Sequence, residues 1–134
     1  MTQIWERLYI GGLADAQLLA KGNPNHIDTV ISLSEACVAS KRRGVNYIHI
    51  PIEDDQPVPV RQFDSIMDAI AEHVRRGTVL VNCGVGLSRA PSLTAAWMTG
   101  VGYKSFDNAL AEVRQLRPII DPSNILLESI RRHL

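Results

Sequence analysis

The sequence predicts a single α/β domain in which helices flank a central, largely parallel sheet of four to five strands. Apolar, strand-like runs alternate along the chain with segments whose apolar residues recur at the helical period, and helical segments end the chain. No repeat, low-complexity tract or linker interrupts this alternation. A length of 134 residues is enough for one domain with a sizeable core, so we expect residues 1–134 to form one unit.

Four apolar runs are the predicted strands. The runs in the middle of the chain are almost continuously apolar, which is typical of strands that are covered on both faces. The four runs are Leu8–Ile10, Thr29–Leu33, Tyr47–Ile52 and Val79–Val81. Ligands of such folds bind beyond the carboxyl ends of the strands, so the residues that follow each run are the first candidates for a site.

Three helices are predicted between and after these strands. Leu13–Ala20 follows the first strand, and in Arg61–Arg76 the apolar side chains fall on one face. Ala90–Met98 follows the last strand, and Pro91 suits its first turn because proline has a fixed φ and no N–H to satisfy.

Two further helices end the chain. Apolar residues repeat at the helical period from Phe106 to Leu116, with Ser105 as a candidate N-cap. Asp121 followed by Pro122 predicts the start of a last helix that continues to about His133.

The bulk composition argues against several classes of protein. Fourteen basic and fourteen acidic residues balance, so we expect no nucleic-acid partner and no membrane attachment. No apolar run approaches the roughly 20 residues of a membrane span. The N-terminal segment does not resemble a signal peptide, and the two cysteines do not suggest a disulfide framework, so we expect a cytoplasmic protein. We also expect a monomer. Cys37 is predicted to be a small buried residue, with a regulatory disulfide to Cys83 as the alternative.

Residues 79–89 carry the most informative pattern: a short apolar strand, a cysteine, five loop residues and an arginine. Gly84 and Gly86 allow the loop to curl tightly. A loop between a strand end and a helix start directs backbone N–H groups inward and binds anions, an environment that favours a thiolate at Cys83. The planar fork of Arg89 can hold two phosphate oxygens. The pattern therefore predicts phosphoryl transfer to sulfur.

The alternative is that Cys83 closes a buried strand and Arg89 is a solvated residue at a helix start. Under that interpretation the strand before the cysteine, the two glycines and the proline-started helix would all be coincidences. Their combination favours a phosphate-binding loop.

A phosphate ester also needs an acid that protonates its leaving oxygen. Glu53, Asp54 and Asp55 all follow the Tyr47–Ile52 strand. Taken alone, three loop carboxylates are ordinary surface residues, but a phosphate-binding loop elsewhere in the chain makes each a candidate acid.

The loop resembles that of the small, atypical dual-specificity phosphatases of the cysteine-dependent protein tyrosine phosphatase superfamily. Their loop reads His-Cys-x-x-Gly-x-x-Arg-Ser/Thr, often with Ser before the Arg and Pro after the Ser/Thr. The matching residues are Cys83, Gly86, Ser88, Arg89 and Pro91. Three further segments match in family order, so the resemblance spans nearly the whole chain: Leu8–Gly12, Ile50–Asp54 and Arg117–Pro122.

The resemblance implies a phosphomonoesterase that acts on phosphotyrosine and, in a shallow pocket, on phosphoserine and phosphothreonine. The reaction would proceed through a cysteinyl-phosphate, without metal or cofactor, on a phosphorylated protein or a small phosphomonoester. Cys83 would be the nucleophile, Arg89 the phosphate clamp and Asp54 the general acid, with Asp55 as the alternative acid. The implied phosphate-binding residues are Gly84, Val85, Gly86, Leu87, Ser88 and Arg89.

The chain departs from the family pattern at two loop positions. Asn82 stands where His is usual, which predicts a less acidic cysteine, and Ala90 replaces the hydroxyl that helps the thiolate leave. Both changes predict a slower enzyme with its second step most affected. Near the last helix Ser123 replaces the usual Asn, so neither Ser123 nor Asn124 is assigned a role.

These departures keep other functions open. One alternative is a pseudophosphatase that binds phosphate without turnover, although such a binder needs neither a nucleophile nor an acid. Others are phosphatases of a phosphoinositide, a nucleotide or an RNA 5′-phosphate, and a sulfurtransferase. The loop residues Gly84–Ser88 carry no Lys or Arg, which argues against a highly charged polyphosphate.

Overall fold

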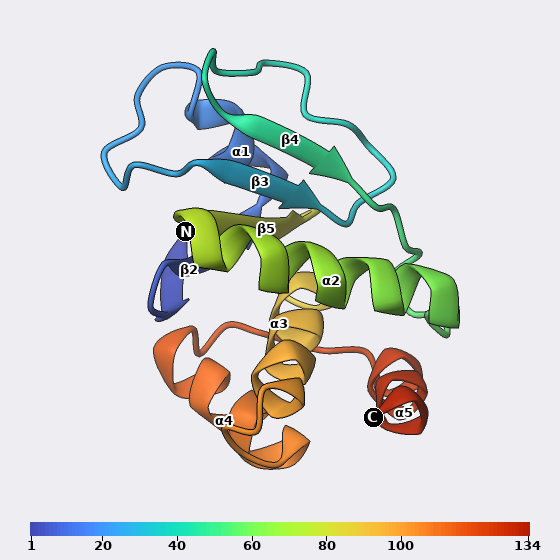
Figure 1. Ribbon diagram of the computed structural model, residues 1–134. Coiled ribbons are helices and arrows are strands. Elements are labelled where there is room, and N and C mark those ends of the chain that lie inside the picture. Colours follow the sequence, from blue (N-terminus) through green and yellow to red (C-terminus); the bar gives the residue numbers. More distant parts are fainter.

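A computed structural model describes residues 1–134 as a five-stranded sheet with helices on both faces (Figure 1). Across the sheet the strands follow the order β1 (Thr2–Trp5), β2 (Leu8–Gly12), β5 (Val79–Cys83), β3 (Thr29–Ser32) and β4 (Asn46–His49). Only the β1–β2 pair is antiparallel; every other neighbouring pair is parallel. The predicted α/β class with a largely parallel sheet is confirmed.

Two strand predictions need correction. Strand β1 was not predicted, because in this edge strand only Ile4 is buried and the polar residues carry little strand signal. The strand predicted over Tyr47–Ile52 ends at His49. Ile50 and Ile52 still donate backbone hydrogen bonds toward β3, but Pro51 between them has no N–H and interrupts the regular ladder.

Five helices complete the fold. They are α1 (Leu13–Leu18), α2 (Val60–Arg76), α3 (Arg89–Gly100), α4 (Phe106–Leu116) and α5 (Asn124–His133). The Ser105 hydroxyl caps α4 by accepting from the Asn108 N–H, as predicted. The last helix starts at Asn124 and not at the Asp121–Pro122 pair, because the Ser123 hydroxyl accepts from the Leu126 N–H and sets the cap.

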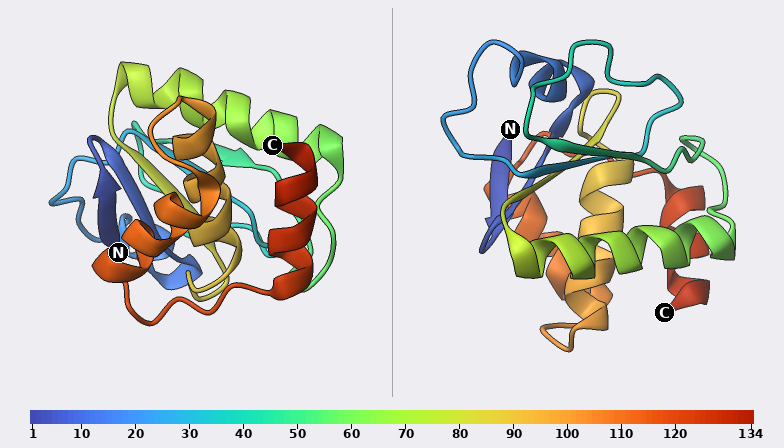
Figure 2. Two further views of the ribbon diagram at one scale, coloured as in Figure 1. Left: turned by 90° about the horizontal axis from the view of Figure 1, so that it is seen from below. Right: turned by 45° about the horizontal axis from the view of Figure 1, so that its top comes forward.

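The helices form unequal layers on the two faces of the sheet (Figures 1 and 2). Strand residues alternate between the faces, so in β5 Val79 and Val81 enter the core beneath α2, α3, α4 and α5, whereas Leu80 enters a smaller core beside α1. The central strands β3 and β5 are buried along their whole length, while β4 at the edge is half exposed. The prediction of full burial therefore holds for β3 but not for β4.

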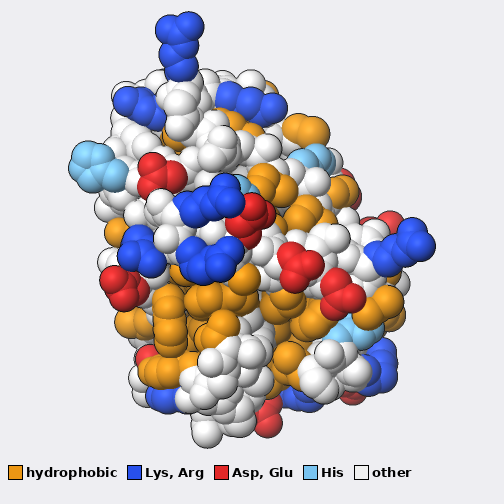
Figure 3. All heavy atoms as spheres, in the orientation of Figure 1, with side chains coloured by type: hydrophobic (Ala, Val, Ile, Leu, Met, Phe, Trp, Pro, Cys, Tyr) orange, Lys and Arg blue, Asp and Glu red, His pale blue; other side chains and the backbone are white.

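The surface carries charges of both signs. In the face shown in Figure 3, basic and acidic side chains lie intermixed above a more apolar lower region, as the equal numbers of the two charges would suggest. None of the helices combines the length and apolarity that crossing a membrane requires.

Candidate active site

The loop Cys83–Arg89 leaves the carboxyl end of β5, between the parallel strands β2 and β3. Parallel strands end at one edge of a sheet, which is where α/β proteins bind ligands. Cys83 is only 2 % exposed, and its Sγ accepts a hydrogen bond from the backbone N–H of Ala90 at 3.4 Å. The first turn of α3 therefore points an amide at the sulfur.

The turn between β2 and α1 supports one side of this loop. Gly86 has φ = +74°, and a Cβ there would lie 2.5 Å from the Gly11 carbonyl carbon, so both the conformation and the space require glycine. The Leu13 N–H also donates to the Gly84 carbonyl at 2.9 Å. The family-like segment Leu8–Gly12 thus serves as a backbone support for the loop.

The segment between α4 and α5 supports the other side. Arg117 donates from Nε to the Gly86 carbonyl at 3.0 Å and from Nη1 to Thr2 Oγ1 at 2.8 Å. The Asp121 N–H donates to the Leu87 carbonyl at 2.8 Å. Sequence reasoning gave Arg117 no role, although its position in the family-like segment Arg117–Pro122 could have indicated one.

Arg89, the last residue of the loop, is almost fully buried, with only 8 % of the residue exposed. Its Nη1 donates to Glu35 Oε1 at 2.9 Å and to the Ile52 carbonyl at 3.0 Å, while its buried Nε has no partner in the protein. One side of the guanidinium is thus fixed by the protein, and the other can bind a ligand oxygen. Sequence reasoning missed Glu35, although its place just after a buried strand could have marked it.

The structure separates the two candidate acids. Asp54 lines a cavity of about 190 Å³ together with the cysteine loop. The neighbouring Asp55 has φ = +57°, and its Oδ1 accepts a hydrogen bond from the Ser123 hydroxyl at 2.8 Å. The other residues that line the cavity are Cys83, Val85, Leu87, Ser88, Arg89 and Asp121.

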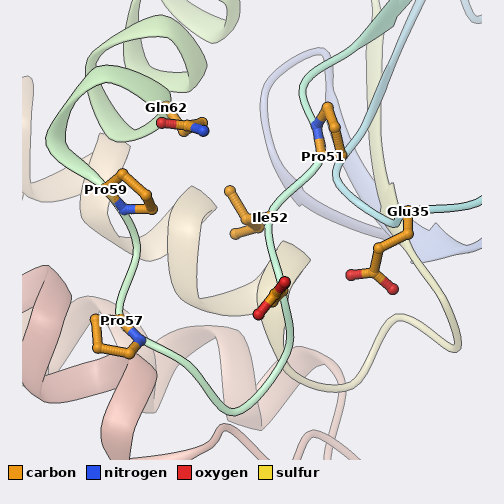
Figure 4. A pocket seen from close by; sticks show the side chains of 7 residues that line it. Glu35, Pro51, Ile52, Pro57, Pro59 and Gln62 are labelled. Atoms are coloured by element: carbon orange, nitrogen blue, oxygen red, sulfur yellow. The ribbon is translucent and has the colours of Figure 1, made fainter.

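A second, larger hollow of about 440 Å³ adjoins the acid-bearing loop, which is the connection between β4 and α2 that carries Asp54. Figure 4 shows side chains from the β3–β4 connection, such as Glu35, and from the start of α2, such as Gln62, on its walls. Prolines from the loop between β4 and α2 form much of the remaining wall. Glu53 lies here and not with Asp54, so the three consecutive carboxylates have three different surroundings.

Ser123 connects the two halves of the site, and sequence reasoning assigned it no role. Its backbone N–H donates to Ser88 Oγ at 3.2 Å, and its hydroxyl donates to Asp55 at 2.8 Å. Ser123 of the α5 cap therefore links the two loops, in addition to the hydrogen bond from Arg89 to the Ile52 carbonyl.

The two departures from the family pattern are both fully buried. Asn82 Oδ1 accepts from the Ser32 hydroxyl at 2.7 Å, and its Nδ2 has no partner. Ala90 offers Cys83 its backbone N–H but has no hydroxyl. Two hydroxyls lie two positions away: Ser88 Oγ accepts from the Ser123 N–H, and Ser92 Oγ donates to the Ser88 carbonyl at 2.7 Å.

Comparison with known proteins agrees with this geometry. The family model described as "Dual specificity phosphatase, catalytic domain" matches residues 8–133, nearly the whole chain. The chain belongs to the dual-specificity phosphatase family. It is thus a cysteine-dependent protein phosphatase, and the pseudophosphatase, non-protein-substrate and sulfurtransferase alternatives are not favoured.

Curated relatives match over almost the whole of this chain and about 70 % of their own length. Dual specificity protein phosphatase 18 of Bos taurus is 28 % identical over 135 residues, which are 97 % of this chain and 70 % of the relative. Dual specificity protein phosphatase 21 of Homo sapiens is 30 % identical, over 96 % of this chain and 69 % of the relative. The crystal structure of DUSP15 is 25 % identical with a TM-score of 0.87, and covers 98 % of this chain and 85 % of that one.

Proposed function

We propose that residues 1–134 act as one phosphatase unit that hydrolyses phosphotyrosine, and also phosphoserine and phosphothreonine, through a cysteinyl-phosphate on Cys83. The observation that carries the proposal is the single cavity that Cys83, Arg89 and Asp54 line together. These three side chains come from two distant parts of the sequence and supply a nucleophile, a cation and an acid.

In the first step Cys83 Sγ attacks phosphorus while the ester oxygen leaves. The inward N–H groups of the phosphate-binding loop 84–89 and the free side of the Arg89 guanidinium stabilise the equatorial oxygens. Asp54 gives its proton to the leaving oxygen, because an alkoxide or phenolate leaves poorly without one. Neither this transfer to sulfur nor the later hydrolysis of the cysteinyl-phosphate requires a metal or cofactor.

In the second step water attacks the cysteinyl-phosphate, with the Asp54 carboxylate now accepting a proton from that water. The Cys83 thiolate leaves, and the Ala90 N–H at 3.4 Å is the donor that stabilises it. A side-chain hydroxyl at position 90 would add a second donor. Its absence makes breakdown of the phosphoenzyme the slow step.

A phosphoprotein is the proposed substrate, handled by a cytoplasmic monomer. Val85 at the cavity is 69 % exposed and can contact the chain on either side of the phosphorylated residue. The adjoining hollow lined by Glu35, Glu53 and Gln62 has room for a neighbouring side chain of a bound peptide.

Turnover of an aryl phosphate, followed by a panel of phosphopeptides with phosphate on Tyr, Ser or Thr, tests this function. Cys83→Ser should abolish turnover and still bind vanadate, because the loop amides and Arg89 remain. A Cys83→Ser variant that keeps more than a few per cent of activity would show that the nucleophile is misassigned. Vanadate binding by wild type without any turnover would instead identify a pseudophosphatase.

A further inference from the structure

A second cysteine lies outside the active site in a chemically specific setting. Cys37, in the connection between β3 and β4, places its Sγ 3.3 Å from Nδ1 of His49 at the end of β4. The other ring nitrogen, Nε2, lies 2.6 Å from the carbonyl oxygen of Ser34. A carbonyl can only accept a hydrogen bond, so Nε2 carries the ring proton and Nδ1 is free to accept the Cys37 S–H.

The surroundings of this pair differ from those expected from the sequence. Cys37 was predicted to be buried but is exposed, because the adjacent Val38 takes the buried position beneath the loop. The predicted alternative of a disulfide with Cys83 is also not formed, since both cysteines are free. An exposed thiol and an oriented imidazole are thus in contact at the surface.

A lysine side chain lies beside the same pair, at a small cavity of about 50 Å³. Lys41 lines the cavity together with Cys37 and His49, and its Nζ lies 5.7 Å from the centre of the Tyr47 ring. A lysine at this place attracts anionic reagents.

We propose that Cys37 and His49 form a reactive thiol site that takes up small anionic disulfides of the glutathione class. A nucleophile, a base within hydrogen-bond reach and a third group that orients the base is the arrangement that activates nucleophiles in enzymes. Lys41 supplies the positive charge that pairs with the reagent's carboxylates.

The reaction is a thiol–disulfide exchange that balances without a further oxidant. His49 Nδ1 accepts the Cys37 proton as Sγ attacks one sulfur of the disulfide. A new S–S bond forms on Cys37 while the bond of the reagent breaks, and its electron pair leaves with the released thiolate. That thiolate takes the proton from His49, so Cys37 is oxidised and one half of the reagent is reduced.

The modified loop is tied directly to the phosphate clamp. Ser34, whose carbonyl holds His49, immediately precedes Glu35, and Glu35 accepts from Arg89 at 2.9 Å. A mixed disulfide removes the S–H···Nδ1 hydrogen bond and places a bulky adduct beside this loop. Modification of Cys37 therefore loosens the Glu35–Arg89 pair and slows turnover, a consequence that rests on the proposed function.

The chemical site is tested without any activity assay. In Cys83→Ser, Cys37 is the sole cysteine of the chain, so mass spectrometry follows its reaction with oxidised glutathione without interference. Adding His49→Gln should slow adduct formation by about tenfold, because the base is lost. Adding His26→Asn, which changes an exposed histidine in a different loop, should leave the rate unchanged.

Two results would overturn the reactive site. One is a rate in Cys83→Ser/His49→Gln equal to that of Cys83→Ser. The other is equal reactivity of Cys83→Ser in its folded form and in denaturant, since the activation depends on folded geometry. The denatured rate also serves as the reference if His49→Gln impairs folding.

The link to the clamp is tested with the wild-type chain. Formation of the single adduct on Cys37 should lower kcat/KM for an aryl phosphate by about two- to fivefold, reversibly with a reducing agent. Cys37→Ser, treated in the same way, should lose nothing. An equal loss in Cys37→Ser would place the effect on Cys83 and refute the link. A wild-type chain without turnover before treatment would refute the proposed function and leave the mass measurements valid.

Discussion

The two loops that meet at the cavity are held very differently. The cysteine loop is braced from two sides by backbone and Arg117 hydrogen bonds, and its key residues Cys83 and Arg89 are buried. The acid-bearing loop is exposed around Asp54 and Asp55, where the Ser123–Asp55 hydrogen bond holds it; its start is fixed separately, because the Ile52 carbonyl accepts from Arg89. The two loops therefore have different roles. The cysteine loop is the rigid loop and stabilises negative charge, and the acid-bearing loop is the adjustable loop and delivers the proton.

The largest expected effect comes from removing the proton donor of the adjustable loop. Asp54→Asn should lower the rate on phosphopeptides by about 10²–10⁴-fold, the usual contribution of acid catalysis. The loss should be small for aryl phosphates with good leaving groups, because these need little protonation. Steady-state kinetics across a series of leaving groups measures the difference.

Asp55→Asn is the matched control for that measurement. It removes a carboxylate one residue away but keeps the Oδ1 acceptor that binds Ser123. We expect no leaving-group dependence beyond that of wild type. If Asp55→Asn shows the steep dependence and Asp54→Asn does not, the acid has been assigned one residue too early.

The second expected effect breaks the rigid loop. Gly86→Ala places a Cβ 2.5 Å from the Gly11 backbone at a positive φ, so the loop must shift. We expect about a 100-fold loss on every substrate, including aryl phosphates, because a misplacement of about 1 Å has this cost. The free energy of unfolding should fall by about 2–4 kcal/mol.

Gly102→Ala controls for conformational strain alone. Gly102 has φ = +83° but no atom within 4 Å of the added Cβ. It should lose only about 1 kcal/mol of stability and keep its activity. Equal kinetics for the two alanine variants would mean that the close contact with Gly11 does not position the loop.

The same comparison explains which parts of the site were predictable from sequence. Cys83, Gly86 and Arg89 lie within seven consecutive residues, so their chemistry is legible in a local pattern. Glu35, Arg117 and Ser123 reach the site through contacts between residues 31 to 68 positions apart, and no local pattern reports such contacts.

The helices and strands were also not equally predictable from the local sequence. Strands buried on both faces, such as β3 and β5, have a strong apolar signal, whereas the polar edge strand β1 was missed. The predicted burial of Cys37 was wrong because cysteine is usually a core residue, whereas here the neighbouring Val38 occupies the core. Edges and loops depend on which of several adjacent residues packs inward, and only the tertiary structure decides this.

The third expected effect comes from removing the hydrogen bond that holds the acid-bearing loop next to Asp54. Ser123→Ala removes the hydrogen bond to Asp55, so Asp54 should be positioned less well. We expect about a tenfold loss for substrates with poor leaving groups, corresponding to about one hydrogen bond to a charged group. Aryl phosphates with good leaving groups should be nearly unaffected, and Ser123→Thr should restore the rate.

Ser105→Ala separates this effect from the loss of a helix cap. Both serines cap a helix by accepting an N–H, so each alanine variant should lose about 1 kcal/mol of stability. Only Ser123 contacts the acid-bearing loop. A leaving-group effect of the same size in Ser105→Ala would assign the loss to stability and not to positioning.

The smallest expected effect is a gain in the rigid loop. A thiolate leaving phosphorus gains charge, and Cys83 receives only the Ala90 N–H at the long distance of 3.4 Å. Ala90→Ser adds a hydroxyl donor, which should raise the steady rate by about fivefold, the equivalent of about 1 kcal/mol. Rapid mixing of wild type with an aryl phosphate should show a burst of phenol close to one enzyme equivalent, and the burst should shrink in Ala90→Ser.

Ala95→Ser, at another fully buried position of α3, controls for the burial of a hydroxyl in this helix. It should leave both the burst and the steady rate unchanged, because position 95 is about 1.4 helical turns away from the Ala90 N–H that donates to the sulfur. A linear wild-type time course, with no gain from Ala90→Ser, would mean that formation of the phosphoenzyme limits turnover. The adjustable acid-bearing loop, and not the thiolate's missing donor, would then set the speed of the enzyme.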